Sequence, residues 1–248
     1  MSGHSKWHNI RLRKGRQDAE RGKLFTRLAR EIIMAAREGG GNPEANNRLR
    51  IAIEKAREHS MPQENIRRAI QRGTGELPGA AYEEVTYEGY GPGGVAVLVE
   101  ASTDNRNRTV AELRTIFSKC GGKLGETGSV AWLFDSRSLI TVPKDAASEE
   151  DVLAVALDAG AEDVQSEEST WNVIGPPEAL ADLRAALDRA GIPVQSAEVT
   201  RLPRTTVHLD GKEAQQMLRL MEQLEDHDDV QNVYANFDIE ESVIVAYT

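Results

Sequence analysis

The order of hydrophobic patterns in residues 138–202 is the feature that most restricts the fold of this 248-residue chain. Apolar residues that alternate with polar ones indicate strands, and apolar residues spaced three and four apart indicate helices. The expected elements are a strand at Leu139–Val142, a helix at Glu149–Ala159, strands at Asp163–Ser166 and Thr170–Ile174, a helix at Glu178–Ala190 and a strand at Val194–Val199. This order is typical of the ferredoxin-like, split β-α-β arrangement, which closes on itself.

Residues 1–80 are predicted to form a small helical unit behind a basic N-terminal arm. Helical spacing begins near Asp18, and the inward residues of three helices are expected to be Leu24, Leu28 and Ile32, then Leu49, Ile53 and Ala56, then Ile66, Ala69 and Ile70. Asn42-Pro43 is expected to start the second helix, and Ser60-Met61-Pro62-Gln63 resembles a capping box for the third.

The remaining segments predict a second α/β region. Strands at 82–90 and 95–101 flank a glycine-rich turn, a helix follows at Arg106–Cys120, and another strand is expected at Val130–Phe134. After residue 202 the pattern predicts a strand at Thr205–Leu209, a helix at Lys212–Glu225 with a capping box at Asp210 and Glu213, and a strand at Val230–Phe237. This last segment is too short to fold alone.

The sequence therefore predicts an α+β protein: an N-terminal helical domain followed by two α/β domains with antiparallel sheets, one of them ferredoxin-like. The expected division is a basic arm plus helical domain at 1–80, a discontinuous α/β domain at 81–136 and 203–248, and an inserted ferredoxin-like domain at 137–202. One continuous sheet through both α/β regions is the alternative.

The net charge of −10 conceals a sharp division along the chain. Residues 1–80 contain 17 Lys and Arg against 9 Asp and Glu, a net +8, whereas the remainder is at −18. The first 30 residues hold nine basic side chains against Asp18 and Glu20 alone. Such asymmetry suggests a basic nucleic-acid-binding segment attached to an acidic body, with a solvated basic helix as the alternative.

Phosphate contacts are expected from the basic residues of the arm and of the first helix. The candidate binding residues are Lys6, Trp7, Arg11, Arg13, Lys14, Arg16, Arg21, Lys23 and Arg27, together with Arg106 and Arg108. Trp7 can either stack on a base or pack as the anchor of the arm.

Arg106 and Arg108 carry positive charge into the first turn of a predicted helix, where the helix dipole disfavours cations. Asp104 or Asn105 is expected to cap this helix. The two arginines either pair with Asp104 or Glu100, or they join the helix N-terminus in a second anion site.

Several classes of function are disfavoured. The chain has no apolar run long enough to span a membrane, no secretory signal, and a single cysteine, Cys120, so a soluble cytoplasmic protein is expected. Gly121-Gly122-Lys123-Leu124 lacks the Ser or Thr of a phosphate-binding P-loop and follows a helix instead of opening one. No catalytic constellation, metal site, cofactor or small-molecule substrate is expected.

Five motifs in order resemble the YebC family over essentially the whole chain. They are Gly3-His4-Ser5-Lys6-Trp7, Arg21-Gly22-Lys23-Leu24-Phe25, Tyr87-Glu88-Gly89-Tyr90-Gly91-Pro92-Gly93-Gly94, Thr103-Asp104-Asn105-Arg106-Asn107-Arg108-Thr109 and Gly128-Ser129-Val130. The resemblance implies three domains, association with nucleic acid and no known catalytic activity. The chain departs from the family pattern at Lys123 and Ser138, and Lys123 is expected to add charge near Arg106 and Arg108.

The function expected is that of a non-enzymatic nucleic-acid-binding regulator of gene expression, because bacterial members of the family look like DNA-binding transcriptional regulators. The alternative is an RNA- or ribosome-associated translation factor, since the mitochondrial relative is a translational activator of cytochrome c oxidase. An enzyme with a pocket between domains is the least favoured hypothesis. No helix-turn-helix with a clear recognition helix is evident, which weighs slightly against sequence-specific reading of DNA.

Overall fold

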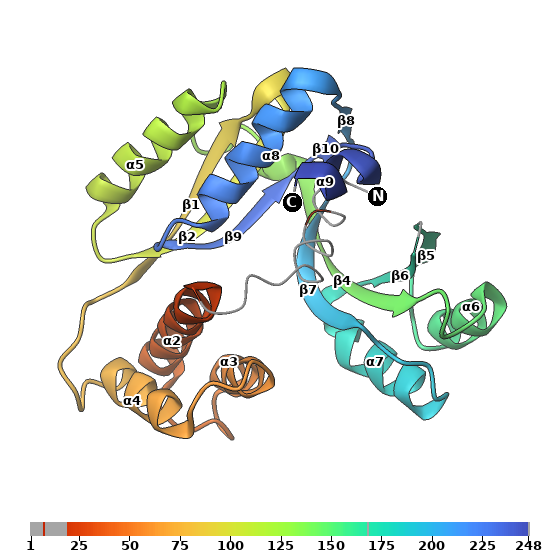
Figure 1. Ribbon diagram of the computed structural model, residues 1–248. Coiled ribbons are helices and arrows are strands. Elements are labelled where there is room, and N and C mark those ends of the chain that lie inside the picture. The colour runs from red at the N-terminus through yellow and green to blue at the C-terminus, as the bar shows by residue number, and fades with distance from the viewer. Residues whose placement is uncertain (1–6, 8–18, 168, 248) are drawn as a thin grey trace.

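Three groups of elements make up the protein in the computed structural model, which describes Trp7 and residues 19–167 and 169–247. A bundle of three helices, a four-stranded sheet with two helices on it and a second four-stranded sheet with two helices of its own lie around the centre of the molecule (Figure 1). The predicted α+β class, with a helical N-terminal region, is confirmed. None of the described helices is long and apolar enough to cross a membrane.

The helical bundle consists of α2 (Ala19–Gly39), α3 (Asn47–Glu58) and α4 (Gln63–Gly73). The predicted apolar rows meet in one core, in which Leu28, Ile32, Leu49, Ile53 and Ile66 are buried. Burial of these faces supplies the favourable free energy that short helices lack when isolated in water.

Two predicted helix caps in the bundle are wrong. The second helix is capped by Asn46 and not by Asn42, since the Asn46 side chain accepts a hydrogen bond from the backbone N–H of Leu49 at 3.1 Å. The Asn46 amide also donates to the carbonyls of Ala35 and Gly40, at 2.7 and 2.9 Å, so one side chain starts α3 and secures the end of α2. Before α4, Ser60 has a φ of 58° and no side chain caps the helix.

The first sheet has the strand order β3-β1-β2-β9, and it contains β1 (Glu83–Tyr90), β2 (Ala96–Thr103), β3 (Lys123–Leu124) and β9 (Val230–Ala235). All of its neighbouring strands are antiparallel. The helices α5 (Arg106–Lys119) and α8 (Gly211–Glu225) pack on the face that carries Val97 and Val99. The opposite face, with Ala96 and Leu98, is covered by the segment from Val130 to Phe134.

That covering segment was predicted as a strand, and the prediction is wrong. Residues Ala131–Leu133 form a single turn of 3₁₀ helix, and the next strand begins at Phe134. The buried carboxylate of Glu88 accepts hydrogen bonds from the backbone N–H groups of Gly128, Val130 and Ala131, at 2.6–2.7 Å. These N–H groups are therefore not available to a neighbouring strand.

The second sheet follows the ferredoxin-like pattern. Its elements are β4 (Phe134–Pro143), α6 (Glu149–Asp158), β5 (Asp163–Ser166), β6 (Thr170–Gly175), α7 (Leu180–Arg189) and β7 (Ser196–Pro203). The strand order β5-β6-β4-β7 places the first strand between the third and the fourth, as this arrangement requires. Ile140, Val173 and Leu183 are buried in its core.

The chain returns to the first sheet after this insertion. The returning elements are β8 (Val207–His208), α8, β9, β10 (Phe237–Asp238) and α9 (Glu241–Tyr247), of which α9 was not predicted. Because β9 pairs directly with β2, we propose the division into residues 1–80, 81–136 with 203–248, and 137–202. The predicted capping box of α8 is wrong, since Asp210 makes no side-chain cap and the Glu213 carboxylate lies near Gly93 instead.

The two asparagines at the start of α3 provide a matched test of this local structure. We expect Asn46→Ala to lower the free energy of unfolding by about 2 kcal/mol, because it removes the cap and leaves buried carbonyls without their donor. Asn42→Ala should cost less than about 1 kcal/mol, because Asn42 only closes an exposed turn with the N–H of Glu44. Urea unfolding of both variants measures the difference, and equal losses would contradict the assignment.

Candidate nucleic-acid interface

The basic residues of α2 face the acidic turn between α8 and β9. The Lys23 ammonium donates to the carbonyl of Asp226 at 3.2 Å. Arg30 donates to the carbonyls of Ser102 and Asp228, at 3.0 and 2.7 Å. Arg27 on the same helix is half-buried, and Arg21 lies in its first turn. Lys23 and Arg30 are therefore in contact with the protein itself.

Asp229 lies at the centre of these contacts, although sequence reasoning did not identify it. Its buried carboxylate accepts hydrogen bonds from Arg30 at 2.9 Å and from Arg108 at 2.8 Å. The hydroxyls of Thr109 and Thr103 donate to the same carboxylate at 2.7 and 3.2 Å. One carboxylate thus joins the helical bundle, through α2, to the N-terminus of α5.

The environment of Asp229 strongly favours its charged form. Burial alone would raise the pKa of this carboxyl group, but hydrogen bonds from Arg108, Thr109 and Arg30, and the charge of Arg108, outweigh it and lower the pKa to about 2. The hydrogen bond and the charge of Asp229 in turn raise the pKa of Arg108. Each partner stabilises the other in the ionised state.

Arg106 and Arg108 have different environments. Arg108 pairs with Asp104 at 3.0 Å and with Asp229 at 2.8 Å. Of the two alternatives for this residue, pairing within the protein or a second anion site, the structure therefore has the pairing. Glu100 is not its partner, because that side chain pairs with Arg201 at 2.8 Å. Arg106 is 60% exposed and lies 3.7 Å from Glu83, a contact that leaves its guanidinium open to solvent. Asp104 and Asn105 were the two candidates for the N-cap of α5, and the structure shows that Asn105 is the cap.

Lys123 does not lie near Arg106 and Arg108, so that expectation is wrong. Arg106 is beside Glu83, the first residue of β1, whereas Lys123 pairs with Tyr90, the last residue of the same strand. An eight-residue strand separates the two positions by roughly 20 Å. The helix α5 runs from one end of the sheet to the other, and this path could not be read from the sequence.

Trp7 is buried, with 1% of its surface exposed. Its ring packs 6.0 Å from that of Tyr247 in α9, and its indole N–H donates to Glu225 in α8 at 3.1 Å. This geometry is that of a packing anchor, and the ring is not available to stack on a base in this conformation. The other candidate residues of the arm, Lys6, Arg11, Arg13, Lys14 and Arg16, lie outside the described residues.

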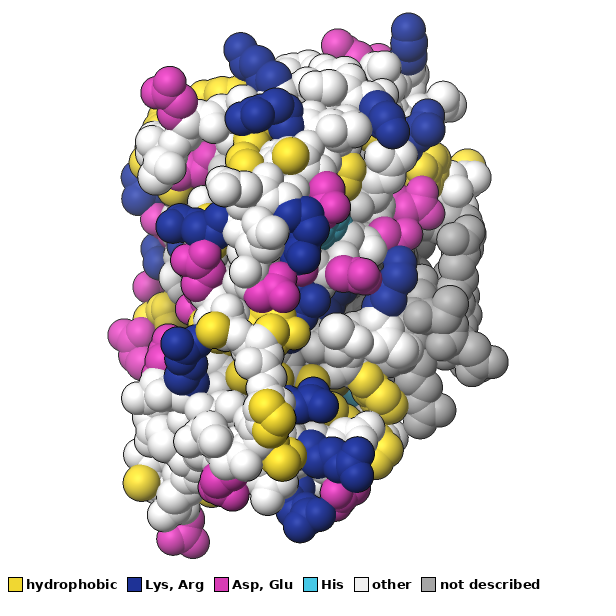
Figure 2. Space-filling model, turned by 90° about the vertical axis from the view of Figure 1, so that its left-hand side faces the viewer, with side chains coloured by type: hydrophobic (Ala, Val, Ile, Leu, Met, Phe, Trp, Pro, Cys, Tyr) yellow, Lys and Arg dark blue, Asp and Glu magenta, His cyan; other side chains and the backbone are white. Residues whose placement is uncertain are grey.

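Exposed cations elsewhere are mostly interspersed with acids. Figure 2 shows Lys and Arg side chains alternating with Asp and Glu over one face of the molecule. On α4, for example, Arg67 and Arg68 both pair with Glu64 at 2.8–3.0 Å. The described surface in this view does not form a basic patch of a single sign.

Glu112, His227 and Asp229 approach each other closely enough to suggest a metal site. However, the atoms that would bind a metal ion already form hydrogen bonds within the protein. The ring nitrogen Nδ1 of His227 accepts the backbone N–H of Asp229 at 3.1 Å, and Nε2 lies 2.8 Å from Glu112. Because the Asp229 oxygens are occupied by arginine and threonine donors, the cluster fits a hydrogen-bonded turn better than a cation.

The two arginines of α5 give a matched stability test. Arg108→Gln should lower the free energy of unfolding by about 1–3 kcal/mol, because a buried carboxylate loses a charged donor. Arg106→Gln should change it by less than about 0.5 kcal/mol, as for other exposed substitutions. Denaturant titration of both variants measures this contrast, and a neutral Arg108→Gln would show that Arg30 and the two threonine hydroxyls satisfy Asp229 without Arg108.

Asp229 should also make stability depend on pH in the acid range. Its pKa is about 2 in the folded protein against an ordinary value of 3.8, so the unfolded chain binds the proton more tightly. The stabilisation, on the order of 2 kcal/mol, is fully present above about pH 4 and is lost as the pH falls through the folded pKa near 2. Unfolding at a series of acidic pH values checks this. Asp229→Asn should lose this contribution, and the exposed neighbour change Asp228→Asn should retain it.

Comparison with known proteins places the chain in a family over most of its length. Residues 5–76 match the description "TACO1/YebC protein N-terminal domain", and residues 82–237 match "TACO1/YebC second and third domain".

Two relatives are each called "Probable transcriptional regulatory protein". The relative from Dictyoglomus turgidum is 58% identical over 245 residues, covering 98% of both chains, and that from Geobacter sulfurreducens is 58% identical over 239 residues, covering 96% of both. The crystal structure of a conserved hypothetical protein from Aquifex aeolicus is similar with a TM-score of 0.79 at 51% identity, over 90% of this chain and 92% of that one. The motifs, the fold and these matches agree that the chain belongs to the TACO1/YebC family.

Proposed function

We propose that this protein is a non-enzymatic, nucleic-acid-binding regulator of gene expression that acts on transcription in the cytoplasm. The observation that carries the proposal is the charge division, with nine basic residues against two acidic ones in the first 30 positions. The names of the relatives support a regulatory role in transcription. Positive charge concentrated at one end of an acidic protein favours binding to phosphates at that end.

The internal contacts divide the candidate binding residues into two groups. We assign direct phosphate contacts to Lys6, Arg11, Arg13, Lys14, Arg16, Arg21 and Arg106. Lys23, Arg27 and Arg108 contribute when nucleic acid displaces or joins their protein contacts, among them Asp226 and Asp229. Trp7 supports the binding segment as an anchor in the core of the first sheet.

An RNA- or ribosome-associated translation factor is the second candidate function. The acidic remainder of the chain, at −18, favours it, because ribosomal proteins are a basic partner for such a surface. Isolation of the tagged protein at physiological salt separates the two functions. Chromosomal fragments in the bound material support the first candidate, and ribosomal RNA with ribosomal proteins supports the second.

The salt dependence of binding tests whether the N-terminal segment contacts phosphates. For Lys14→Gln, the slope of log affinity against log salt should fall by roughly 0.7 on a single strand and 0.9 on a duplex. Unrelated sequences should weaken in parallel, because phosphate contacts carry little sequence information. Lys55→Gln is the matched control, since Lys55 is an exposed lysine of α3 beside Glu31 and is not assigned to the interface.

Trp7→Ala should behave differently from the charge variant. Loss of a buried anchor should lower thermal stability and weaken all polynucleotides alike, with little change in slope. An unchanged slope for Lys14→Gln together with wild-type affinity for Trp7→Ala would remove the N-terminal segment from the binding surface.

A further inference from the structure

Trp132 is the most exposed of the large apolar side chains in the described part of the chain, with 63% of its surface accessible. Large apolar groups are ordinarily drawn into the core, and an exposed tryptophan that is held rigidly is a common feature of binding surfaces. Trp132 lies in the turn between the two sheets, just before β4. Neither the division of charge along the chain nor the contacts of α2 with the turn at residues 226–229 explain why Trp132 is exposed.

The turn that carries Trp132 is fixed by a buried group. Glu88 is 4% exposed, and its carboxylate gathers three backbone N–H groups from Gly128, Val130 and Ala131. Burial would raise the pKa of Glu88, but these three hydrogen bonds outweigh it and lower the pKa. The carboxylate is thus charged at neutral pH and orders the backbone immediately before Trp132, so the indole is presented from a rigid support.

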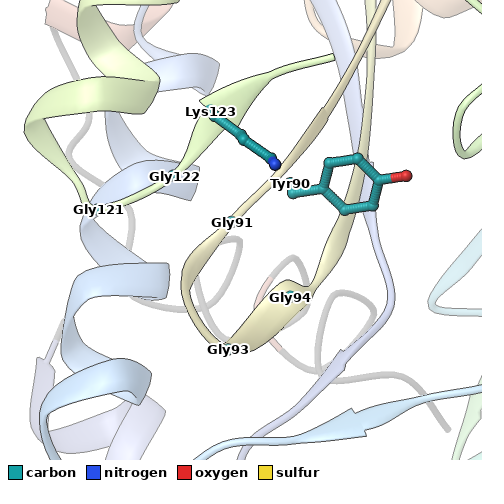
Figure 3. Close-up of a pocket in the computed structure, with 7 residues that line it drawn as sticks. All are labelled: Tyr90, Gly91, Gly93, Gly94, Gly121, Gly122 and Lys123. Atoms are coloured by element: carbon teal, nitrogen blue, oxygen red, sulfur yellow. The ribbon is translucent and has the colours of Figure 1, made fainter. Parts of the chain in front are cut away.

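A second aromatic ring and a cation adjoin Trp132. The indole N–H of Trp132 and the hydroxyl of Tyr90 both donate to the carbonyl of Ser129, at 3.2 and 3.3 Å. The ammonium of Lys123 lies 5.7 Å from the centre of the Tyr90 ring, toward which it points (Figure 3). These contacts place an exposed indole, a tyrosine ring and a lysine in succession along one surface.

The lysine and the tyrosine line an open hollow of about 420 Å³ whose other lining residues are five glycines. No carboxylate from the described part of the chain lines it, although the protein as a whole is acidic. The Glu213 carboxylate lies close to one of the lining glycines, 3.4 Å from the position that a Cβ would take at Gly93. A Cβ at Gly122 would lie 2.5 Å from the carbonyl of Tyr90, so these glycines allow the close backbone packing that keeps the hollow open on the Lys123 side.

The chemistry of this surface fits a nucleotide better than a protein. The N–H of Trp132 is already satisfied by Ser129, so the ring offers its π face and not a hydrogen bond. Its neighbours in the turn, Glu126, Thr127 and Gly128, are exposed and polar or small, whereas the centre of a protein interface is a contiguous apolar patch. Isolated aromatic faces next to cations are the usual means of binding single-stranded nucleic acid.

We propose that Trp132, Tyr90 and Lys123 form a subsite for an unpaired nucleotide of a single strand. The base stacks on the Trp132 ring, the Tyr90 ring extends the aromatic surface, and Lys123 binds a neighbouring phosphate. This inference rests on the proposed function and adds to it a place where unpaired DNA or RNA is distinguished from a duplex, since only an unpaired base can reach the indole face.

Binding of oligothymidylate, oligouridylate and a DNA duplex of the same length tests the subsite. Trp132→Ala should weaken binding to both single strands by between about fivefold and a hundredfold, with the salt slope unchanged and duplex binding retained. Lys123→Gln should reduce the salt slope on single strands by roughly 0.7. The matched controls are Trp171→Phe and Lys144→Gln, because Lys144 lies 4.5 Å over the Trp171 ring in the second sheet and makes the same kind of pair.

Tryptophan fluorescence gives a direct readout of stacking. In the Trp171→Phe protein, oligothymidylate should quench the emission of the exposed Trp132, and the further change Trp132→Phe should abolish this quenching. Trp7 remains as a buried internal reference. Because Trp132 is exposed, its variants should keep the wild-type melting temperature, which confirms that any loss of binding is local.

The outcomes separate this inference from the proposed function. If the wild-type protein binds single strands and Trp132→Ala binds them equally well, the subsite is overturned while the proposed function stands. If the wild-type protein binds none of the three probes, both the subsite and the proposed function are overturned. Equal weakening on duplex and single strand overturns stacking, and so does a Trp132→Ala variant that binds oligonucleotides normally but loses a copurifying protein. A larger effect of Trp132→Ala on oligouridylate than on oligothymidylate supports RNA as the source of the unpaired nucleotide, and the reverse supports DNA.

Discussion

The interaction on which the arrangement of the molecule most depends is the one around the Asp229 carboxylate. Arg30 from the helical bundle and Arg108 from α5 donate to it at 2.9 and 2.8 Å. A buried carboxylate is tolerated only with such partners, and the largely buried guanidinium of Arg30 would also be costly to leave without this carboxylate. The bundle therefore cannot move away from the first sheet without exposing or orphaning these charges. The Arg30 guanidinium lies over the Tyr82 ring as well, at 4.9 Å, close to where the linker enters β1.

This use of cations for internal contacts limits where nucleic acid can bind. Several basic side chains that look available in the sequence, among them Lys23, Arg30 and Arg108, are partly neutralised by the turn at residues 226–229. A polynucleotide must displace those acids before it gains the full attraction. The candidates that remain for phosphate contacts are the basic residues at the start of the chain, which lie outside the described residues, and Arg106, which is 60% exposed beside Glu83. Net charge alone would not have made this distinction.

The sequence predicted those elements whose patterns are local. The strands and helices of the second sheet lie within a few residues of their expected positions, because alternating and helical periodicities are short-range signals. The failures share a different cause. Asn46 replaces Asn42 as a cap because it also reaches α2, and residues 130–134 are not a strand because Glu88, about 40 positions earlier, takes their N–H groups. Asp229 was missed because its partners come from α2 and α5, more than 100 residues away.

Asp229 and Glu88, the two buried carboxylates among the described residues, are satisfied in different ways, and the difference bears on where a ligand can bind. Asp229 is neutralised by two side-chain cations, Arg30 and Arg108, whose charge is thereby shared with a protein carboxylate. Glu88 is satisfied by backbone N–H groups, which contribute dipoles and consume no Lys or Arg. Lys123 therefore remains an exposed cation beside the ordered turn, with an aromatic ring as its neighbour instead of a carboxylate. Among the described residues no carboxylate forms an ion pair with Lys123, whereas a phosphate at Arg108 must compete with Asp104 and Asp229. This contrast is the physical reason for expecting the selective contact near Trp132, and for expecting Arg108 to act chiefly through its contacts within the protein.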